Sequence, residues 1–124
     1  MDSIFGPLVF DEGWYTSKVI HLFQKEYTIN VCAQAYYKTD NITKEQELAF
    51  EYYKEYEAQA LKMAETLLDS RFGADCAVRF VPRTMLFERN GSYTLLCDDI
   101  EAPEEGIAVL LSPKQMIMSQ NDYL

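Results

Sequence analysis

The chain contains one histidine, His21, and three cysteines, Cys32, Cys76 and Cys97. A single histidine excludes a His–His metal pair, and His21 lies between Ile20 and Leu22 in a predicted strand, where a histidine is more often a packed or surface residue than a catalytic one. The cysteines are odd in number, widely spaced and without a C-x-x-C pair, which argues against a disulfide framework and against a zinc knuckle. We therefore expect these four residues to form no metal site, and we expect no cofactor.

Basic residues are also few. Eleven Lys and Arg stand against 20 Asp and Glu, so the formal net charge is -9. Binding to nucleic acid or to an anionic membrane depends on clustered Lys and Arg, and neither partner is expected here. The first residues have no basic segment followed by a long apolar run, and no stretch is long enough for a membrane helix. With its unpaired cysteines, the chain is expected to be cytoplasmic.

Aromatic side chains are abundant, with nine Tyr, seven Phe and one Trp in 124 residues. Each large ring buries roughly 150–250 Å², so a chain of this length can build a sizeable core without disulfides. No linker, repeat or low-complexity tract divides the sequence. We expect one domain over residues 1–124.

The first third of the chain is typical of β-strands. Residues 14–23 are rich in β-branched and aromatic side chains, and the polar break at 24–26 has the length of a hairpin turn. Apolar side chains then occupy alternate positions from 27 to 35. This period of two predicts a strand with one buried face.

A long helix is predicted over residues 43–70. Thr43 is a good N-cap, and Gln46 three positions later completes a capping box. No Gly or Pro interrupts the segment, and Gly73 provides a stop just beyond it. The stripe expected to be buried steps by three and four residues and contains Tyr53, Tyr56, Ala60, Met63 and Leu67.

The rest of the chain returns to strands, which are predicted at residues 77–81, 84–88, 93–97, 106–111 and 115–118. Pro82 should end the first of them or mark a sheet edge. The Asn90-Gly91 pair is a strong hairpin signal. The predicted fold is α+β, with a β-meander, one long helix and a second β-meander, the helix packing on one face of a mainly antiparallel sheet.

The highest concentration of charge lies in residues 98–105, which contain no base and five carboxylates: Asp98, Asp99, Glu101, Glu104 and Glu105. The spacing does not match an EF-hand calcium loop. A carboxylate pair for acid–base catalysis is chemically conceivable, but no further motif completes such a site. The segment is typical of a solvated acidic loop, and the alternative is a partner-binding loop with all five carboxylates on one exposed surface.

The sequence contains several short motifs, each of them once: NGSYTLLCD (residues 90–98), EGIAV (105–109), QND (120–122), FGPLVF (5–10) and Trp14. The pattern resembles a family of small bacterial domains of unknown function, with a Gly-Ser-Tyr hairpin, an acidic loop, a Gly-Ile-Ala-Val strand and a closing Gln-x-Asp. Thr94 departs from it, since the family often has Gly there. Some members lie near polymorphic toxin genes as candidate immunity proteins. The resemblance implies no catalytic residue.

These observations lead to one expected function and two alternatives. The acidic balance, the acidic segment and the resemblance favour a non-enzymatic protein-binding module with a basic protein partner, of the immunity type that neutralises a basic toxin domain. A small carboxylate-dependent enzyme and an accessory domain without a specific target remain the alternatives. The sequence gives no catalytic residue for the enzyme.

Overall fold

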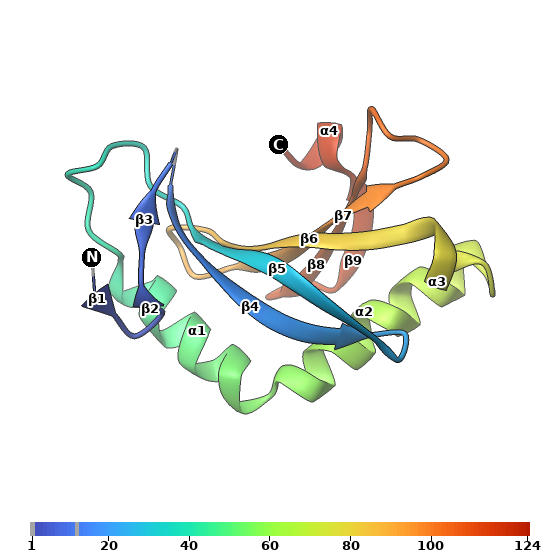
Figure 1. Ribbon diagram of the computed structural model, residues 1–124, viewed down its shortest axis with the longest axis horizontal. Helices are drawn as coiled ribbons and strands as arrows, with labels where there is room; N and C mark the ends of the chain where they lie inside the picture. Colours follow the sequence, from blue (N-terminus) through green and yellow to red (C-terminus); the bar gives the residue numbers. More distant parts are fainter. Residues whose placement is uncertain (1, 12) are drawn as a thin grey trace.

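The computed structural model describes residues 2–11 and 13–124, which form an α+β fold (Figure 1). The elements, in chain order, are β1 (Asp2–Ser3), β2 (Gly6–Pro7), β3 (Val9–Phe10), β4 (Trp14–Leu22), β5 (Lys25–Ala33), α1 (Lys44–Glu55), α2 (Glu57–Phe72), α3 (Cys76–Arg79), β6 (Phe80–Phe87), β7 (Tyr93–Asp99), β8 (Ile107–Ser112), β9 (Met116–Ser119) and α4 (Gln120–Tyr123). Within the described residues, no helix has the length and apolar character needed to cross a membrane.

One seven-stranded sheet dominates the fold, in the order β3-β4-β5-β6-β7-β8-β9. All neighbouring strands are antiparallel except β5 and β6, which are parallel. The parallel pair follows from the chain order, because α1, α2 and α3 cross over between these two strands. The predicted α+β fold with a mainly antiparallel sheet is confirmed.

The hairpin between β4 and β5 turns one residue earlier than the polar break suggested. Its two-residue turn consists of Phe23 and Gln24, which have positive φ angles of 52° and 65°. Two consecutive left-handed residues match the twist of the flanking strands. The Phe23 N–H donates a hydrogen bond of 2.8 Å to Glu65 Oε2, so α2 holds the tip of this hairpin.

The predicted capping box at the start of α1 is confirmed. The Gln46 N–H donates to Thr43 Oγ1 at 3.0 Å, and the Thr43 N–H donates to Gln46 Oε1 at 2.9 Å. Gln46 is fully buried, and its Nε2 also donates to the carbonyls of Gln34 and Phe87, each at 3.0 Å. One side chain therefore ties the helix start to the chain just after β5 and to the end of β6.

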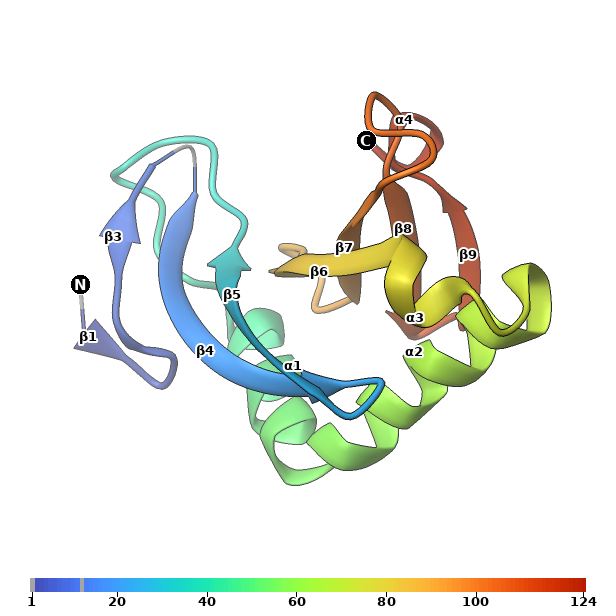
Figure 2. The same ribbon diagram turned by 45° about the vertical axis from the view of Figure 1, so that its right-hand side comes forward.

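The segment predicted as one long helix over residues 43–70 is helical, but it consists of two helices, α1 and α2. The helix bends at Tyr56, whose φ of -113° and ψ of 26° separate α1 from α2 (Figure 1). The bend lets α1 pack against β6 while α2 packs against β4, β8 and β9, and both helices lie on the same side of the curved sheet (Figure 2). Tyr56 points outward at the bend and is 37% exposed, so its predicted burial is wrong.

The buried stripe of α2 is shifted by one residue from the predicted one. Tyr53 is buried as expected, whereas Ala60, Met63 and Leu67 are only partly buried. The fully packed positions of the two helices are Gln46, Phe50, Tyr53, Leu61, Ala64 and Leu68. Within each helix their spacing is still three and four residues, as helical packing on a sheet requires.

Residues 76–79 form the short helix α3 rather than the start of the predicted strand at 77–81. β6 then runs without interruption through Pro82, with a register shift between Pro82 and Thr84. β5 pairs with β6 only from Thr84 onward. Pro82 therefore lies where β6 has no partner on the β5 side, which accommodates a residue without an N–H group.

An aromatic cluster occupies the core between the sheet and α1. The Phe87 ring lies 5.5 Å from those of Phe5 and Phe50, 6.0 Å from that of Tyr53 and 5.3 Å from that of Tyr93, measured between centroids. Phe87 and Tyr53 are fully buried. This cluster fixes α1 against the strands that lead into the acidic segment.

Candidate functional site

The acidic segment forms an ordered loop between β7 and β8. Asp98 and Asp99 are the last two residues of β7, and the loop rises from the sheet beside α4 (Figure 1). The Ala102 N–H donates to the Asp99 carbonyl at 3.1 Å, and the Gly106 N–H donates to the Ala102 carbonyl at 3.1 Å. These consecutive turns give the loop a defined backbone path.

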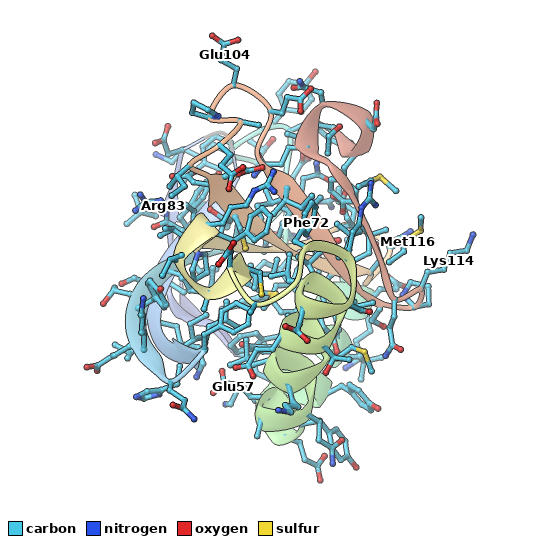
Figure 3. The ribbon with its side chains drawn as sticks, turned by 90° about the vertical axis from the view of Figure 1, so that its right-hand side faces the viewer. Glu57, Phe72, Arg83, Glu104, Lys114 and Met116 are labelled. Atoms are coloured by element: carbon cyan, nitrogen blue, oxygen red, sulfur yellow. The ribbon has the colours of Figure 1, made fainter. Side chains whose placement is uncertain are left out.

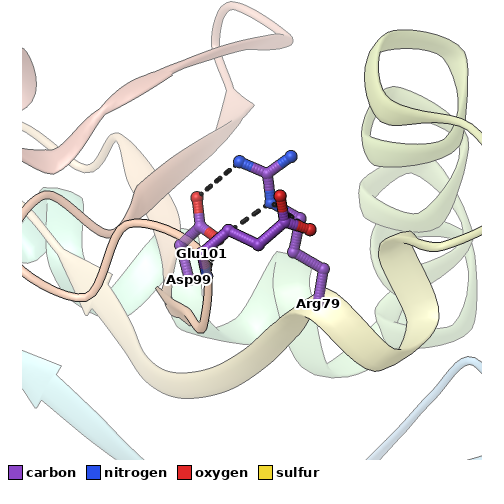
Figure 4. A network of polar contacts seen from close by, with 3 residues as sticks. All are labelled: Arg79, Asp99 and Glu101. Atoms are coloured by element: carbon purple, nitrogen blue, oxygen red, sulfur yellow. Dashed lines mark hydrogen bonds and ion pairs between the residues drawn. The ribbon is translucent and has the colours of Figure 1, made fainter.

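A partly buried ion pair anchors the start of the loop (Figure 4). Arg79 Nε and Nη2 donate to the two carboxylate oxygens of Asp99 at 2.8 and 3.0 Å. The Asp99 side chain is 5% exposed and also accepts the Glu101 N–H at 3.0 Å. The guanidinium group holds the pKa of Asp99 below its ordinary value, because its hydrogen bonds favour the ionised carboxylate.

The expectation that all five carboxylates share one exposed surface is therefore wrong for Asp99. Its side chain turns inward toward Arg79 at the end of α3, while its neighbour Asp98 points outward. This difference follows from strand geometry, in which successive side chains point to opposite faces. Asp99 builds the loop instead of presenting charge.

A second contact closes the base of the loop. Gln120 Nε2, from α4, donates to the carbonyls of Cys97 at 2.8 Å and Ile107 at 3.3 Å, one on each side of the loop. Gly106 lies between them with a φ of +63°, and a Cβ atom there would come within 2.6 Å of Gln120 Nε2. This contact explains Gly106 and Gln120 of the sequence motifs, since only glycine at position 106 leaves room for the Gln120 side chain.

The remaining carboxylates face outward. Asp98 pairs with Arg83 at 2.6 Å, and both side chains are more than half exposed, which makes this a solvated pair. Glu101 is 62% exposed, with its Oε2 3.8 Å from Arg79 Nε. Glu104 projects from the tip of the loop (Figure 3), and Glu105 beside it is also exposed. Residues 101–105 line an open hollow of about 360 Å³.

Sequence reasoning missed Arg79 and Arg83. Each lies well before the acidic segment in the chain, and only the pairing of β6 with β7 brings Arg83 opposite the end of β7 and places α3 next to the loop. Gln120 was noted only as part of a motif. Neither its position nor its type predicts that it bonds two backbone carbonyls.

His21 and the three cysteines do not come together as a metal site in the described part of the chain. His21 is exposed on β4, and Cys32, Cys76 and Cys97 are buried free thiols. Burial raises the pKa of Cys32 to about 11 and also raises the pKa of Cys97, so both thiols are protonated at neutral pH. Over residues 2–11 and 13–124, no three His, Cys, Asp or Glu side chains are grouped so that they could hold a metal ion.

No protein-family model, curated protein sequence or solved structure matches this chain.

Replacing Asp99 with asparagine should lower the free energy of unfolding by about 1.5–3 kcal/mol, because Arg79 loses a charged, bidentate partner. The depressed pKa of Asp99 stabilises the fold above the pKa of the unfolded carboxyl, and this contribution is lost as the pH falls through the folded pKa. Urea denaturation of the wild type should therefore show a steeper loss of stability in acid than that of Asp99→Asn.

The matched control is Asp98→Asn, which removes the neighbouring, solvated ion pair. It should change stability by less than about 1 kcal/mol. Equal losses for the two variants would contradict the role of Asp99 as the anchor of the loop.

Proposed function

We propose that this chain is a non-enzymatic protein-binding module, and that the outward carboxylates of the loop bind a basic protein surface. The observation that carries the proposal is how the loop is built. Asp99 is committed to Arg79, and Gln120 closes the base, while Glu101, Glu104 and Glu105 are left facing solvent. The fold thus supports three exposed carboxylates on a loop with fixed ends.

A loop with a defined path is suited to binding because less conformational entropy is lost when a partner docks. Its carboxylates would attract Lys and Arg over a distance, which raises the rate of association. The open hollow lined by residues 101–105 offers several loop residues to one long basic side chain. Shape and charge together favour a cationic protein as the partner.

The resemblance to small bacterial domains extends the proposal to the class of partner. We propose a basic toxin domain encoded next to this chain, which the chain neutralises in the bacterial cytoplasm as an immunity protein. The formal charge of -9 supports this choice, since it complements a basic domain.

The main alternative is a carboxylate-dependent enzyme, and the anchor disfavours it. A general acid or base works best with a pKa near the operating pH. Asp99 is instead held ionised by Arg79, with a lowered pKa. The Asp98 carboxylate is paired with Arg83 on the surface.

The test uses peptides selected from a random library displayed on phage against the immobilised full-length chain. Selected peptides should be rich in Lys and Arg. In Glu104→Lys/Glu105→Lys their association should slow several-fold at about 0.1 M salt, where the Debye length is ~10 Å, and the difference should vanish near 1 M, where it is ~3 Å. Stopped-flow fluorescence measures these rates.

The control is Glu51→Lys/Glu55→Lys, which makes the same charge change on the exposed side of α1. Its association rate should stay closer to that of the wild type. The proposal fails if the selected peptides have no excess of basic residues, or if the loop variant and the α1 variant slow association equally. Either result would favour an accessory domain without a specific target.

A further inference from the structure

We infer that the docking surface has an apolar centre, formed by Ile100 and Val78, and that the partner inserts an apolar side chain flanked by Lys or Arg. The inference rests on the proposed function and assigns the specificity-determining residues of the same surface. Both residues are exposed aliphatic side chains, and they belong to different elements.

Ile100 and Val78 are among the most exposed apolar residues of the described chain, at 62% and 63%. They come from separate elements, the acidic loop and α3. The Ile100 N–H donates to the Arg79 carbonyl at 3.0 Å, which places the loop residue directly beside the end of the helix that carries Val78. Two exposed aliphatic residues therefore lie on adjoining segments, where α3 meets the acidic loop.

The contacts of Arg79 hold this junction in place. The Arg79 guanidinium carbon lies 4.7 Å from the centroid of the Phe72 ring and 5.0 Å from that of Phe80, and its nitrogens bind Asp99. Figure 3 shows Phe72 on the same side of the molecule as the acidic loop. A guanidinium stacked on two rings and held by a carboxylate has little freedom to move.

Acidic residues flank Ile100 in the chain. Ile100 lies between Asp99 and Glu101 in the chain, and Asp98, Glu101 and Glu104 are all exposed. An apolar centre with a polar rim is the usual arrangement of a specific interface. Charge complementarity identifies the occupant as a segment in which basic residues flank an aliphatic or aromatic one.

The acidic residues and the apolar residues of this surface should affect different rate constants. Exposed charges at the rim steer the encounter and so set association, whereas apolar anchors at the centre set how long the complex lasts. The wild-type surface should select library peptides that place an apolar residue between basic ones.

The experiment measures both rate constants for those selected peptides with Ile100→Ser and Val78→Ser in the full-length chain. Dissociation should become about tenfold faster in each variant, as for a typical anchor residue, while association changes less than about twofold. Val9→Ser is the control, because Val9 is 71% exposed on β3 at the other edge of the sheet. It should leave both rate constants unchanged, and all three variants should keep the wild-type urea midpoint.

The outcomes separate this inference from the proposed function. If dissociation is unchanged in Ile100→Ser and Val78→Ser while Glu104→Lys/Glu105→Lys still slows association, the acidic loop binds without an apolar centre and the inference is wrong. If neither set of variants alters binding, the proposed function is wrong as well. If Val9→Ser accelerated dissociation as much as Ile100→Ser and Val78→Ser do, the inference would also be wrong, because the peptides would then show no preference for this surface.

Discussion

Replacing Phe87 with alanine should lower the free energy of unfolding by about 3–5 kcal/mol. The ring is fully buried and lies within 6.0 Å of four other aromatic rings, so its removal opens a cavity that rigid neighbours cannot fill. The backbone of Phe87 would be left in place, since its carbonyl accepts hydrogen bonds from Gln46 Nε2 and the Gln34 N–H. Equilibrium denaturation in urea measures the loss.

Tyr37→Ala provides the comparison, because Tyr37 is 71% exposed. Removal of this ring should change stability by less than about 0.5 kcal/mol. A loss in Phe87→Ala no larger than that in Tyr37→Ala would show that the aromatic cluster is not the centre of the core.

Replacing Leu68 with alanine should lower the free energy of unfolding by about 2–5 kcal/mol, because Leu68 is fully buried between α2 and the sheet. The same change at the adjacent Leu67 should have a clearly smaller effect, because that side chain is only partly buried. The pair is matched in chemistry and in helix propensity, so the difference in stability reports which face of α2 is buried.

The two variants decide between the predicted and the observed stripe. Urea denaturation of both, at the same pH and salt, gives the comparison. If Leu67→Ala were the more damaging, α2 would be rotated by about one residue from its described position, or 100° about its axis.

This pair also shows what the sequence could and could not predict in the helical region. The T-x-x-Q box fixed the start of α1, because Thr43 and Gln46 satisfy local backbone groups whatever the rest of the chain does. The buried face of α2 was ambiguous, because Met63 and Ala64 are both apolar and so are Leu67 and Leu68. A period of three and four residues fits either set.

The bend at Tyr56 had no local signal. Kinks usually occur at Pro or Gly, and this segment has neither. The bend accompanies the curvature of the sheet, which depends on strands far away in the chain and is not encoded by the residues that bend. Single-sequence patterns therefore predicted a helix here but not its shape.

The acidic loop was also predicted only in part from the sequence. Its charge and its place between two strands followed from composition and turn signals alone. The inward turn of Asp99 did not, because it depends on Arg79, a residue of a helix that the sequence pattern had assigned to a strand. Local patterns identified the loop, and a long-range contact decided which of its carboxylates are available to a partner.

The order of strands in the seven-stranded sheet also bears on aggregation. One edge strand, β9, is only four residues long, whereas at the other edge the two residues of β3 pair only with Trp14 and Tyr15, so β4 has no β3 partner from Thr16 to Leu22. A long bare edge invites pairing with another chain, and short edges offer only a few hydrogen bonds for it. The β9 edge therefore offers little to a second chain, whereas on the β4 side the longer edge makes the net charge of -9 a useful defence against edge-to-edge association.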